Sequence, residues 1–535
     1  MKKRLPLLLS RNPTLLQPLI RSSFTAVLLM LDAVANTAAS SAVTEDATRP
    51  VYHLVSSSKR SHIADPNFAF FWKGRYHLFY ITARNLETKR RNFAHVSSTD
   101  MVHWEHHPET NFGGLSGTIF LSTEGVPTII GKSSKKITML TPMDDQLEKW
   151  ELLTTVEPTF GPGQDGSRMS DKHWDPDAWV IGDTTYVLIC SHPLSPESQP
   201  ALLKTTDMKT FHFVDYFLDP DMPGVARTSD VKTNDDLSCP NFFPLGNKWM
   251  MLCISHNKGC RYYLGDWKDE KFVPDFHGWM NWHKGENESE HGHGGDVFAP
   301  ESLLTPDGRR VMWAWLFAQS TLRVSPHWQE VISLPRELSL PEDGVLRIKP
   351  LRELEQLRYD LKTAQNLHVE ADTTHRLKDL SGDTMELMVK IKQGNAQKYG
   401  VKVLCDQENG KGVDIIVDPS AKTLQVGESI APLDIQKEEI ALRIFIDRSI
   451  IEVFANDRQA VVWQHVYEAG DLGVCLFSEG GGMEVSAVKG WHMKSISPEF
   501  KSRKNTNEAQ KHHEHDTTSL CTNCTFNPVG KKKNK

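Results

Sequence analysis

The sequence predicts an all-β protein in which a β-propeller is followed by a β-sandwich. Between residues 51 and 338, short aromatic and β-branched runs alternate with Gly, Pro, Asn and Asp, and sustained helical periodicity is almost missing. A weak internal repeat runs through this half, and alternating strand patterns return after about residue 376. Together these observations favour two consecutive β-domains.

The repeat is a turn-like segment at residues 98–104 (STDMVHW), 145–150 (DQLEKW) and 206–211 (TDMKTF). Its aspartates are 45 and then 62 positions apart. These spacings are close to the roughly 40 to 50 residues that one four-stranded propeller blade occupies. At that blade size, about 290 residues predict five or six blades. Coincidental turn chemistry is the alternative explanation of the repeat.

The domain boundaries follow from where these patterns change. We expect the propeller over residues 51–340, a linker with a short helix over 341–376 and the sandwich over 377–496. The clearest strand pattern of the second half spans residues 440–454, where residues 447–449 (DRS) form a predicted hairpin turn.

The N-terminus has the composition of an export signal. Residues 1–50 combine early basic residues, an apolar run at 24–31 and small residues from 33 to 42, although Asp32 interrupts the apolar stretch. We therefore expect a signal peptide and leader and a secreted or periplasmic protein, with a transit peptide or an unstructured leader as the alternatives. No other stretch is apolar for the eighteen or so residues of a membrane span.

Composition narrows the class of partner. The net charge of -7 gives no support for a nucleic acid or an anionic membrane as the partner. The 14 Trp and 23 Phe are compatible with an aromatic-lined carbohydrate cleft.

The eight cysteines do not form a tidy disulfide framework. Cys190, Cys253, Cys405 and Cys475 lie in apolar runs, which predicts buried free thiols. Residues 497–535 are polar and lysine-rich, and we expect a disordered tail. The tail contains CTNC and HHEH, which are residue types that bind zinc, but a solvated tail is favoured, and neither a metal nor a cofactor is predicted.

A carboxylate at the start of a predicted strand anchors the functional interpretation. In HIADPNFAFFWKG, Pro66 restricts Asp65 to an extended conformation just before an aromatic strand, and a Lys-Gly turn leads into the next strand. Alone, the motif also fits an Asx turn. It resembles the Asn-Asp-Pro-Asn-Gly signature of glycoside hydrolase family 32, the invertase, levanase and inulinase family. The resemblance implies that Asp65 is the nucleophile and that the propeller has five blades.

Two further motifs follow in the order of that family. HWDPDAW (173–179) is similar to the Arg-Asp-Pro motif, which implies that Asp175 stabilises the transition state and that Trp174 stands where the family has a substrate-contacting arginine. DDLSCPNFFP (235–244) resembles the Glu-Cys-Pro segment that supplies the acid/base. Here Ser238 replaces the glutamate, and a serine hydroxyl has no suitable pKa to protonate a leaving group.

Two carboxylates are candidates for the missing acid/base. Because side chains alternate across a strand, Asp236 shares a face with Ser238, displaced by about 6.6 Å at roughly 3.3 Å per residue, and a bulge would bring it into place. Asp235 would then point away. The second candidate is Glu301, in a segment similar to the Tyr-Ala-Pro-Gln run that lines the pocket of the family.

Other matches imply substrate contacts. LSGT (115–118) resembles the Phe-Ser-Gly-Ser loop of the family, so Ser116 and Gly117 are expected to hydrogen-bond sugar. Trp72 and Trp104 are platforms for a sugar face if they are exposed, and core residues otherwise. Asn67, Trp174 and Ser238 complete the predicted substrate-binding set. LPREL (334–338) resembles the motif that closes the propeller, and DRSIIEVF (447–454) resembles the sandwich domain.

The resemblance implies an exported retaining β-fructofuranosidase that acts on fructans or sucrose-type oligosaccharides. Retention requires two carboxyl groups about 5 to 5.5 Å apart. Ala64, Phe68 and Ile81 also depart from the family pattern around the sugar site, so sucrose is not singled out as the substrate. The alternatives are a non-catalytic fructan-binding protein that lost its acid/base, a fructosyltransferase, or another furanosidase on the same fold. The LPREL segment and the second β-domain argue against an arabinan-cleaving furanosidase.

Overall fold

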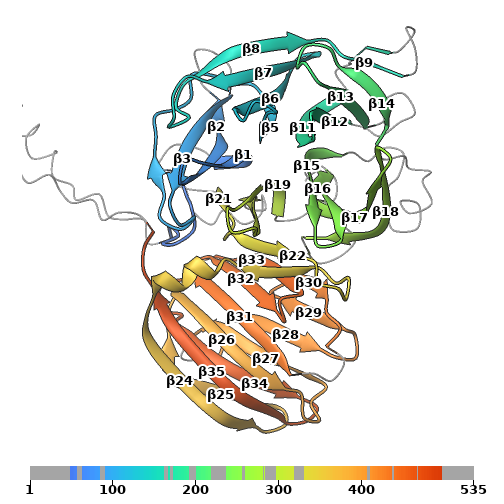
Figure 1. Ribbon diagram of the computed structural model, residues 1–535. Helices are drawn as coiled ribbons and strands as arrows, with labels where there is room; N and C mark the ends of the chain where they lie inside the picture. Colours follow the sequence, from blue (N-terminus) through green and yellow to red (C-terminus); the bar gives the residue numbers. More distant parts are fainter. Residues whose placement is uncertain are drawn as a thin grey trace, which may run out of the picture. The chain divides into compact units, whose positions relative to one another are not determined.

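The computed structural model describes residues 48–56, 63–84, 91–161, 167–168, 173–191, 200–217, 237–255, 259–280, 282, 297–317, 330–406, 410–435, 439–466 and 468–496. Within these residues the regular structure is almost entirely β-strand, which confirms the predicted all-β class (Figure 1). The predicted leader up to residue 47 and the predicted tail from residue 497 lie outside the described residues.

Five sheets of antiparallel strands occupy the first half of the chain. The first sheet is β1 (Ile63–Trp72), β2 (Arg75–Arg84), β3 (Arg91–Ser98) and β4 (Glu105–His106). The second is β5 (Ser116–Leu121), β6 (Pro127–Ser133), β7 (Lys136–Pro142) and β8 (Trp150–Val156). The third is β11 (His173–Ile181), β12 (Thr184–Ser191), β13 (Ala201–Thr205) and β14 (His212–Tyr216). The fourth is β15 (Ser238–Leu245), β16 (Lys248–Ser255), β17 (Gly259–Lys268) and β18 (Lys271–Trp279). The fifth is β19 (Val297–Leu304), β20 (Arg310–Phe317), β21 (Glu330–Ile332), β22 (Arg336–Ser339) and β23 (Arg347–Pro350). A separate pair is β9 (Thr159–Phe160) and β10 (Ser167–Arg168).

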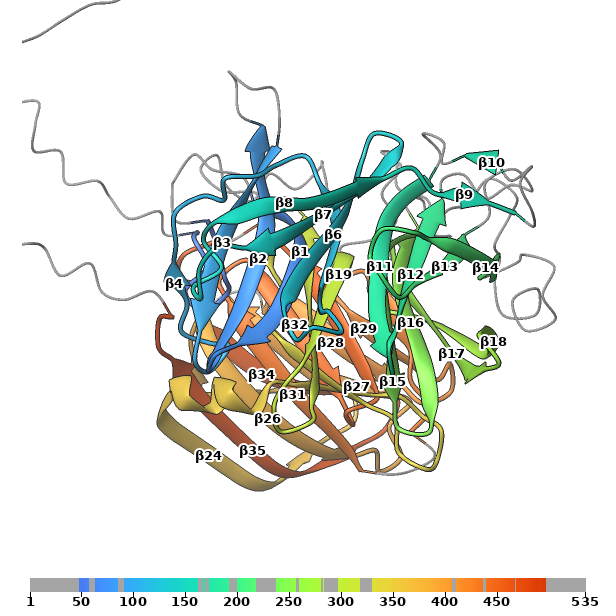
Figure 2. The ribbon, with the colours of Figure 1, turned by 45° about the horizontal axis from the view of Figure 1, so that its top comes forward.

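These five sheets are the blades of a closed propeller. The first strand of each sheet lies at the centre, where β1 contacts β5, β5 contacts β11, β11 contacts β15 and β15 contacts β19. Strand β19 in turn contacts β1, so the ring closes (Figures 1 and 2). Side chains at the start of these inner strands therefore converge on one end of the central axis.

Turns in the propeller follow the local chemistry of the sequence. The predicted turn between β1 and β2 is confirmed, with Lys73 at φ 44° and Gly74 at φ 84°, the left-handed pair that a two-residue hairpin requires. The aspartates of the internal repeat, Asp100 and Asp207, each accept backbone N–H groups in the turn between the third and fourth strands of a blade. In the second blade Asp144 has this role. The sequence repeat was aligned on Asp145, which is one residue after the aspartate that accepts these hydrogen bonds.

The second half of the chain forms two six-stranded sheets. One is β24 (Arg358–Val369), β35 (Met483–Met493), β26 (Thr384–Lys392), β31 (Ile440–Asp447), β32 (Ile450–Ala455) and β33 (Gln459–Gln464). The other is β25 (Thr373–Ser381), β34 (Gly473–Glu479), β27 (Lys398–Cys405), β28 (Val413–Asp418), β29 (Thr423–Val426) and β30 (Ser429–Pro432). Apolar side chains from both sheets, including Leu387, Val401 and Leu476, form one buried cluster, which is the core of the predicted sandwich.

The linker predicted over residues 341–376 is wrong. Strand β23 completes the fifth blade, and β24 and the start of β25 already belong to the sandwich. Only the short 3-10 helix η2 (Arg352–Leu357) lies between the two domains. The sequence signal was weak because β24 is an edge strand in which only Val369 is buried, so its side chains do not alternate between apolar and polar.

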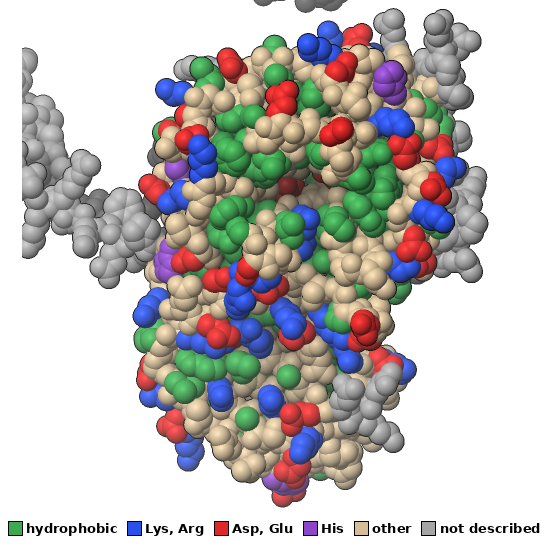
Figure 3. All heavy atoms as spheres, viewed as in Figure 1, with side chains coloured by type: hydrophobic (Ala, Val, Ile, Leu, Met, Phe, Trp, Pro, Cys, Tyr) green, Lys and Arg blue, Asp and Glu red, His purple; other side chains and the backbone are tan. Residues whose placement is uncertain are grey.

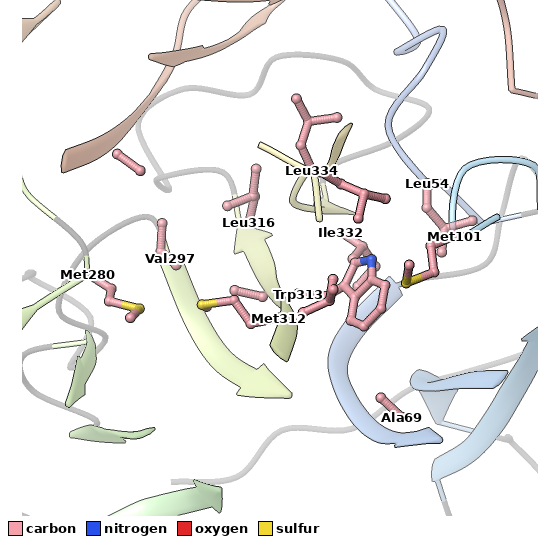
Figure 4. Close-up of a cluster of buried hydrophobic side chains, with 14 of the residues drawn as sticks. Leu54, Ala69, Met101, Met280, Val297, Met312, Trp313, Leu316, Ile332 and Leu334 are labelled. Atoms are coloured by element: carbon pink, nitrogen blue, oxygen red, sulfur yellow. The ribbon is translucent and has the colours of Figure 1, made fainter. Parts of the chain in front are cut away.

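The largest apolar cluster packs the first and last blades together. Trp313 and Met312 of β20 lie among Leu54, Met101 and Leu334, which come from distant parts of the chain (Figure 4). The same cluster includes sandwich residues such as Phe445 and Phe454, so the two domains share a core.

A buried polar network joins the N-terminal segment to both domains. Asp447 accepts hydrogen bonds from the backbone N–H groups of Val51, Tyr52 and His53 and from the His53 ring at 2.8 Å. Glu452 accepts a hydrogen bond from Arg336 of β22 at 2.8 Å and contacts the other His53 nitrogen at 3.2 Å. Burial lowers the pKa of His53, but the bonds to the two carboxylates outweigh this effect and raise it to about 9.

Candidate functional site

Four of the five inner strands share one local feature, a proline near the start of the strand with a shift in the strand register beside it. The sequences are Asp65-Pro66 in β1, Asp175-Pro176 in β11, Cys239-Pro240 in β15 and Ala299-Pro300 in β19. A proline has no N–H to give to the ladder, so a bulge at these points is expected. The residues before the prolines form a first layer around the axis, and those after them form a second layer.

The first layer brings the two predicted aspartates to one point. Asp175 is 6% exposed, and its Oδ2 accepts a hydrogen bond from the backbone N–H of Cys239 at 3.0 Å and lies 3.6 Å from the Cys239 Sγ. Burial and the charges of Asp175, Asp65 and Glu301 raise the pKa of the Cys239 thiol well above its usual range. Asp65, Asp175 and Glu301 therefore all act on Cys239.

The predicted sugar loop lies beside the first blade. Asn67 Nδ2 donates to the backbone carbonyl of Gly117 at 3.0 Å, and the Ser116 hydroxyl donates to Asn67 Oδ1 at 3.2 Å. The structure thus brings Asn67, which is two residues beyond Asp65, together with Ser116 and Gly117. Their role in binding sugar stays a prediction.

The second layer contains acids and amides that the sequence reasoning only partly recognised. Asp177 accepts the backbone N–H of Phe242 at 2.6 Å, which ties β11 to β15. Burial raises the pKa of Asp177 to about 7. Asn241 donates to Glu301 at 3.2 Å and accepts from Ser302 at 2.7 Å. In each of the four strands, the residue directly after the proline is an acid or an amide, in the order Asn, Asp, Asn and Glu from β1 to β19. This repeated pattern is the sequence signal that identifies the second layer.

Glu301 belongs to this second layer. It is 3% exposed, and its Oε1 accepts the backbone N–H of Ala69 at 3.2 Å. Ala69 is four residues beyond Asp65, so this contact lies roughly 12 Å further along β1 at about 3 Å per residue. Burial raises the pKa of Glu301 well above its usual range, which favours the neutral carboxyl.

The position of the missing acid/base is only partly within the described residues. Ser238 is 1% exposed at the start of β15, opposite Ile254 of β16. Asp235 and Asp236 lie outside the described residues, and Trp174 lies in β11 with a side chain that is not described. Among the described residues, Asp65 and Asp175 are the acids of the first layer.

The two tryptophans that were candidate sugar platforms lie elsewhere. Trp72 is the last residue of β1, at the end opposite Asp65, where it contacts Phe70. Its prediction as a substrate-binding residue is wrong, because a strand ten residues long separates its two ends by about 30 Å. Trp104 is buried against Trp313, which makes it a core residue.

A cavity of about 380 Å³ lies further along the axis, below the second layer. Its lining includes Asp177, Asn241, Arg310 and the rings of Phe243 and Trp249. Arg310 packs over the Phe243 ring at 4.0 Å, and burial lowers its pKa to about 10. Figure 3 shows a hollow at the centre of the propeller that is bordered by hydrophobic side chains and has acidic atoms within it. No local pattern in the sequence indicates that Arg310 lines this cavity.

No group of three or more His, Cys, Asp or Glu in the described ranges has the arrangement of a metal site. The CTNC and HHEH segments of the tail lie outside those ranges. No helix in the described part of the chain has the length and hydropathy of a membrane span.

Two family models match consecutive parts of the chain. The model described as the N-terminal domain of glycosyl hydrolases family 32 matches residues 56–350, and the model described as the C-terminal domain of the same family matches residues 353–492. The break between them falls at η2, where the structure places the domain boundary.

Known proteins resemble the chain over most of its length. A levanase of Bacillus subtilis is 26% identical over 538 residues, which cover 88% of this chain and 74% of the relative. A raffinose invertase of Escherichia coli is 26% identical over 468 residues, which cover 79% of this chain and 90% of the relative. The crystal structure of fructan 1-exohydrolase IIa from Cichorium intybus has a TM-score of 0.68 at 18% identity and covers 85% of this chain and 98% of its own. A further structure of that exohydrolase holds 1-kestose.

Proposed function

Because this chain belongs to glycosyl hydrolase family 32, we propose that it is a retaining hydrolase of β-fructofuranosyl linkages. The observation that carries the proposal is the convergence of Asp65 and Asp175 on Cys239 at the mouth of the propeller. Retaining cleavage needs one carboxylate to attack the anomeric carbon while neighbouring groups stabilise the developing oxocarbenium charge. Asp65 fits the nucleophile, and Asp175 fits the stabilising group.

The general acid comes from Asp236 in this proposal, with Glu301 as the second candidate. The acid must reach the leaving-group oxygen from the face of the sugar opposite the nucleophile, with the two carboxyl groups about 5 to 5.5 Å apart. Glu301 is held by Ala69 and Asn241 in the second layer, but its charge still acts on Cys239, so it is kept as the second candidate behind Asp236.

The substrate is a fructan or a sucrose-type oligosaccharide, on the model of the levanase and invertase relatives. Asn67, Ser116 and Gly117 supply hydrogen-bonding groups for sugar hydroxyls next to Asp65. Trp174 and Ser238 differ from the family pattern, so sucrose is not singled out as the substrate. The basic, apolar and small-residue order of residues 1–50 supports secretion.

The experiment measures fructose release from sucrose, raffinose, inulin and levan by the full-length protein and its Asp65→Asn variant. We expect the wild type to release fructose from at least one of them. The variant should lose release and retain binding, because an amide keeps the shape of the carboxylate but cannot form the covalent intermediate. Asp183→Asn is the matched control, since Asp183 is exposed in the turn between β11 and β12 of the same blade.

Three results would separate the alternatives. Equal release by Asp65→Asn and wild type would remove Asp65 from the mechanism. Binding of fructans by the wild type without release from any of them would favour a binding protein. Longer oligosaccharides formed from sucrose would indicate a fructosyltransferase.

A further inference from the structure

Two cysteines of the sandwich lie next to each other on adjacent strands. In the β27–β34 pair, Lys402 is opposite Cys475 and Cys405 is opposite Gly473, so the cysteines are diagonal neighbours. The Sγ of Cys405 points back at the backbone carbonyl of Lys402, at 3.4 Å. Because Lys402 is the residue directly across from Cys475, this contact brings the Cys405 sulfur toward the Cys475 side chain.

A bulge puts both thiols on the same face of the sheet. Val401 and Val403 point into the sandwich core, and the next residue, Leu404, also belongs to that core although strict alternation would turn it outward. Leu404 has φ 55°, and the register shifts between Val403 and Cys405. The extra residue turns Cys405 to the outer face.

Cys475 reaches the same outer face by ordinary alternation. Its neighbours Val474 and Leu476 belong to the core cluster, whereas Cys475 does not. Without the bulge, Cys405 would face the core and the two thiols would be on opposite sides of the sheet.

Two basic residues flank Cys475 on this face. Arg376 of β25 is its partner on one side, and Lys402 of β27 is its partner on the other. A hydrogen bond from Cys405 lowers the pKa of Cys475, burial opposes this effect, and the charges of Arg376 and Lys402 add to it, which brings the pKa to about 7. The same hydrogen bond and burial raise the pKa of Cys405. Thiol reactivity depends on the thiolate, so Cys475 is the attacking group and Cys405 is placed to resolve it.

We propose that Cys405 and Cys475 form a redox pair that closes into a cross-strand disulfide between β27 and β34 when the protein meets a small disulfide such as glutathione disulfide. The Cys475 thiolate attacks one sulfur of glutathione disulfide and releases one glutathione thiolate. Cys405 then gives up its proton, attacks the Cys475 sulfur of the mixed disulfide and displaces the second glutathione. The two electrons and two protons of the protein thiols end on two molecules of glutathione.

Access of glutathione disulfide to Cys475 depends on the side chains that cover it. Cys475 is 4% exposed, and Arg376, an exposed side chain, lies next to it. Cys405 is fully buried, and diagonal neighbours lie about 7 to 8 Å apart, just beyond the usual Cα separation of a disulfide. Closure therefore needs Arg376 to move aside and the two strands to shift slightly. The other cysteines on neighbouring strands, Cys253 and Cys260, lack this arrangement, because they belong to two different core clusters on opposite faces of the sheet.

The experiment treats the reduced full-length protein with glutathione disulfide and follows intact mass and cysteine-containing peptides. We expect the wild type to lose the mass of two hydrogen atoms and to yield a peptide pair cross-linked through Cys405 and Cys475. Cys405→Ser should instead accumulate one glutathione on Cys475, since nothing resolves the mixed disulfide. Cys475→Ser should acquire neither the cross-link nor glutathione at Cys405 in the same time.

Cys260→Ser is the matched control and should cross-link like the wild type, and circular dichroism should show that every variant is folded. Peptide mapping separates this cross-link from one between Cys521 and Cys524 of the tail. The proposal is overturned if the folded wild type keeps both thiols free under these conditions. It is also overturned if Cys405→Ser and Cys475→Ser take up glutathione equally fast, since the pair would then have no attacking member.

Discussion

The carboxylate of Asp175 accepts the backbone N–H of Cys239 at 3.0 Å, and this bond joins the inner strands of the third and fourth blades at their open ends. Cys239 has φ 48°, a left-handed conformation that is unfavourable for a side chain other than glycine, asparagine or aspartate. The bond from Asp175 therefore helps to hold a strained turn beside Asp65. One carboxylate thus combines a structural role with its proposed role in catalysis.

These two roles of Asp175 can be separated by two substitutions. In Asp175→Asn the amide oxygen can still accept the Cys239 N–H, but the negative charge is lost. We expect kcat for fructose release to fall by about 100-fold or more, the usual effect of removing one group that stabilises the transition state, with a nearly unchanged Tm.

In Asp175→Ala the buried N–H of Cys239 loses its partner, which costs about 1 to 3 kcal/mol. The alanine variant should therefore unfold at lower denaturant concentration than the asparagine variant. Normal kcat in Asp175→Asn, or equal unfolding midpoints in the two variants, would contradict this division of roles.

Glu301 offers a test of the second layer. Burial raises the pKa of this carboxyl and favours its neutral form, which glutamine resembles, whereas alanine leaves Ala69 N–H and Asn241 without their acceptor. We expect Glu301→Gln to retain kcat within a few-fold of the wild type and Glu301→Ala to be the less stable of the two. Steady-state kinetics and denaturant unfolding measure both effects. A loss of about 100-fold or more in Glu301→Gln would instead indicate a general acid.

The His53 network predicts how stability depends on pH. The folded state raises the pKa of His53 from 6.5 to about 9, so it holds this proton more tightly than the unfolded chain does. The resulting stabilisation is fully present below pH 6.5 and is lost as the pH rises through about 9. At 1.36 kcal/mol per unit, the free energy of unfolding should fall by up to about 3 kcal/mol across this window.

Denaturant unfolding at several pH values checks this slope. His53→Gln should be less stable at every pH and should show a smaller fall between pH 6.5 and about 9. His103→Gln is the control, because His103 is an exposed histidine that contacts Asp100. An identical pH slope in wild type and His53→Gln would show that His53 does not hold a proton in the folded state.

Much of the fold could be predicted because the responsible chemistry is local. Lys73 and Gly74 mark a hairpin by their own backbone preferences, and the turn after Asp447 follows from the strand patterns on either side. The aspartates before Pro66 and Pro176 identified the strand starts that meet at the axis. Each of these signals lies within a few residues of the feature that it predicts.

The errors arose where the outcome depends on distant partners. Strand β24 owes its conformation to pairing with β35, more than a hundred residues away, and its exposed side chains carry no alternation. The place of Trp72 depends on where its strand ends relative to Asp65, which an aromatic residue by itself does not reveal. Asp177 and Asn241 of the second layer were missed because they gain meaning only when the four proline-containing strands are superimposed around one axis.

Because Ser238 stands where the family has its acid/base glutamate, another residue must supply the proton. If Asp236 is the acid/base, Asp236→Asn should strongly reduce kcat on natural fructans, whose leaving groups need a proton. An aryl fructoside with a good leaving group should lose much less in the fructosylation step, because its departure needs little protonation. Hydrolysis of the fructosyl-enzyme would then become slow, since the same residue also activates water.

Added azide separates an acid/base role from a structural one. Azide attacks the fructosyl-enzyme without base assistance, so it should partly restore turnover in Asp236→Asn and yield a fructosyl azide. A variant that has lost only a structural contact gains nothing from azide, because its acid/base is still present. If Asp236→Asn keeps near-normal rates on fructans while Glu301→Gln shows the dependence on leaving group and azide, the role passes to Glu301. Its carboxyl would then have to leave the contacts with Ala69 and Asn241 during turnover.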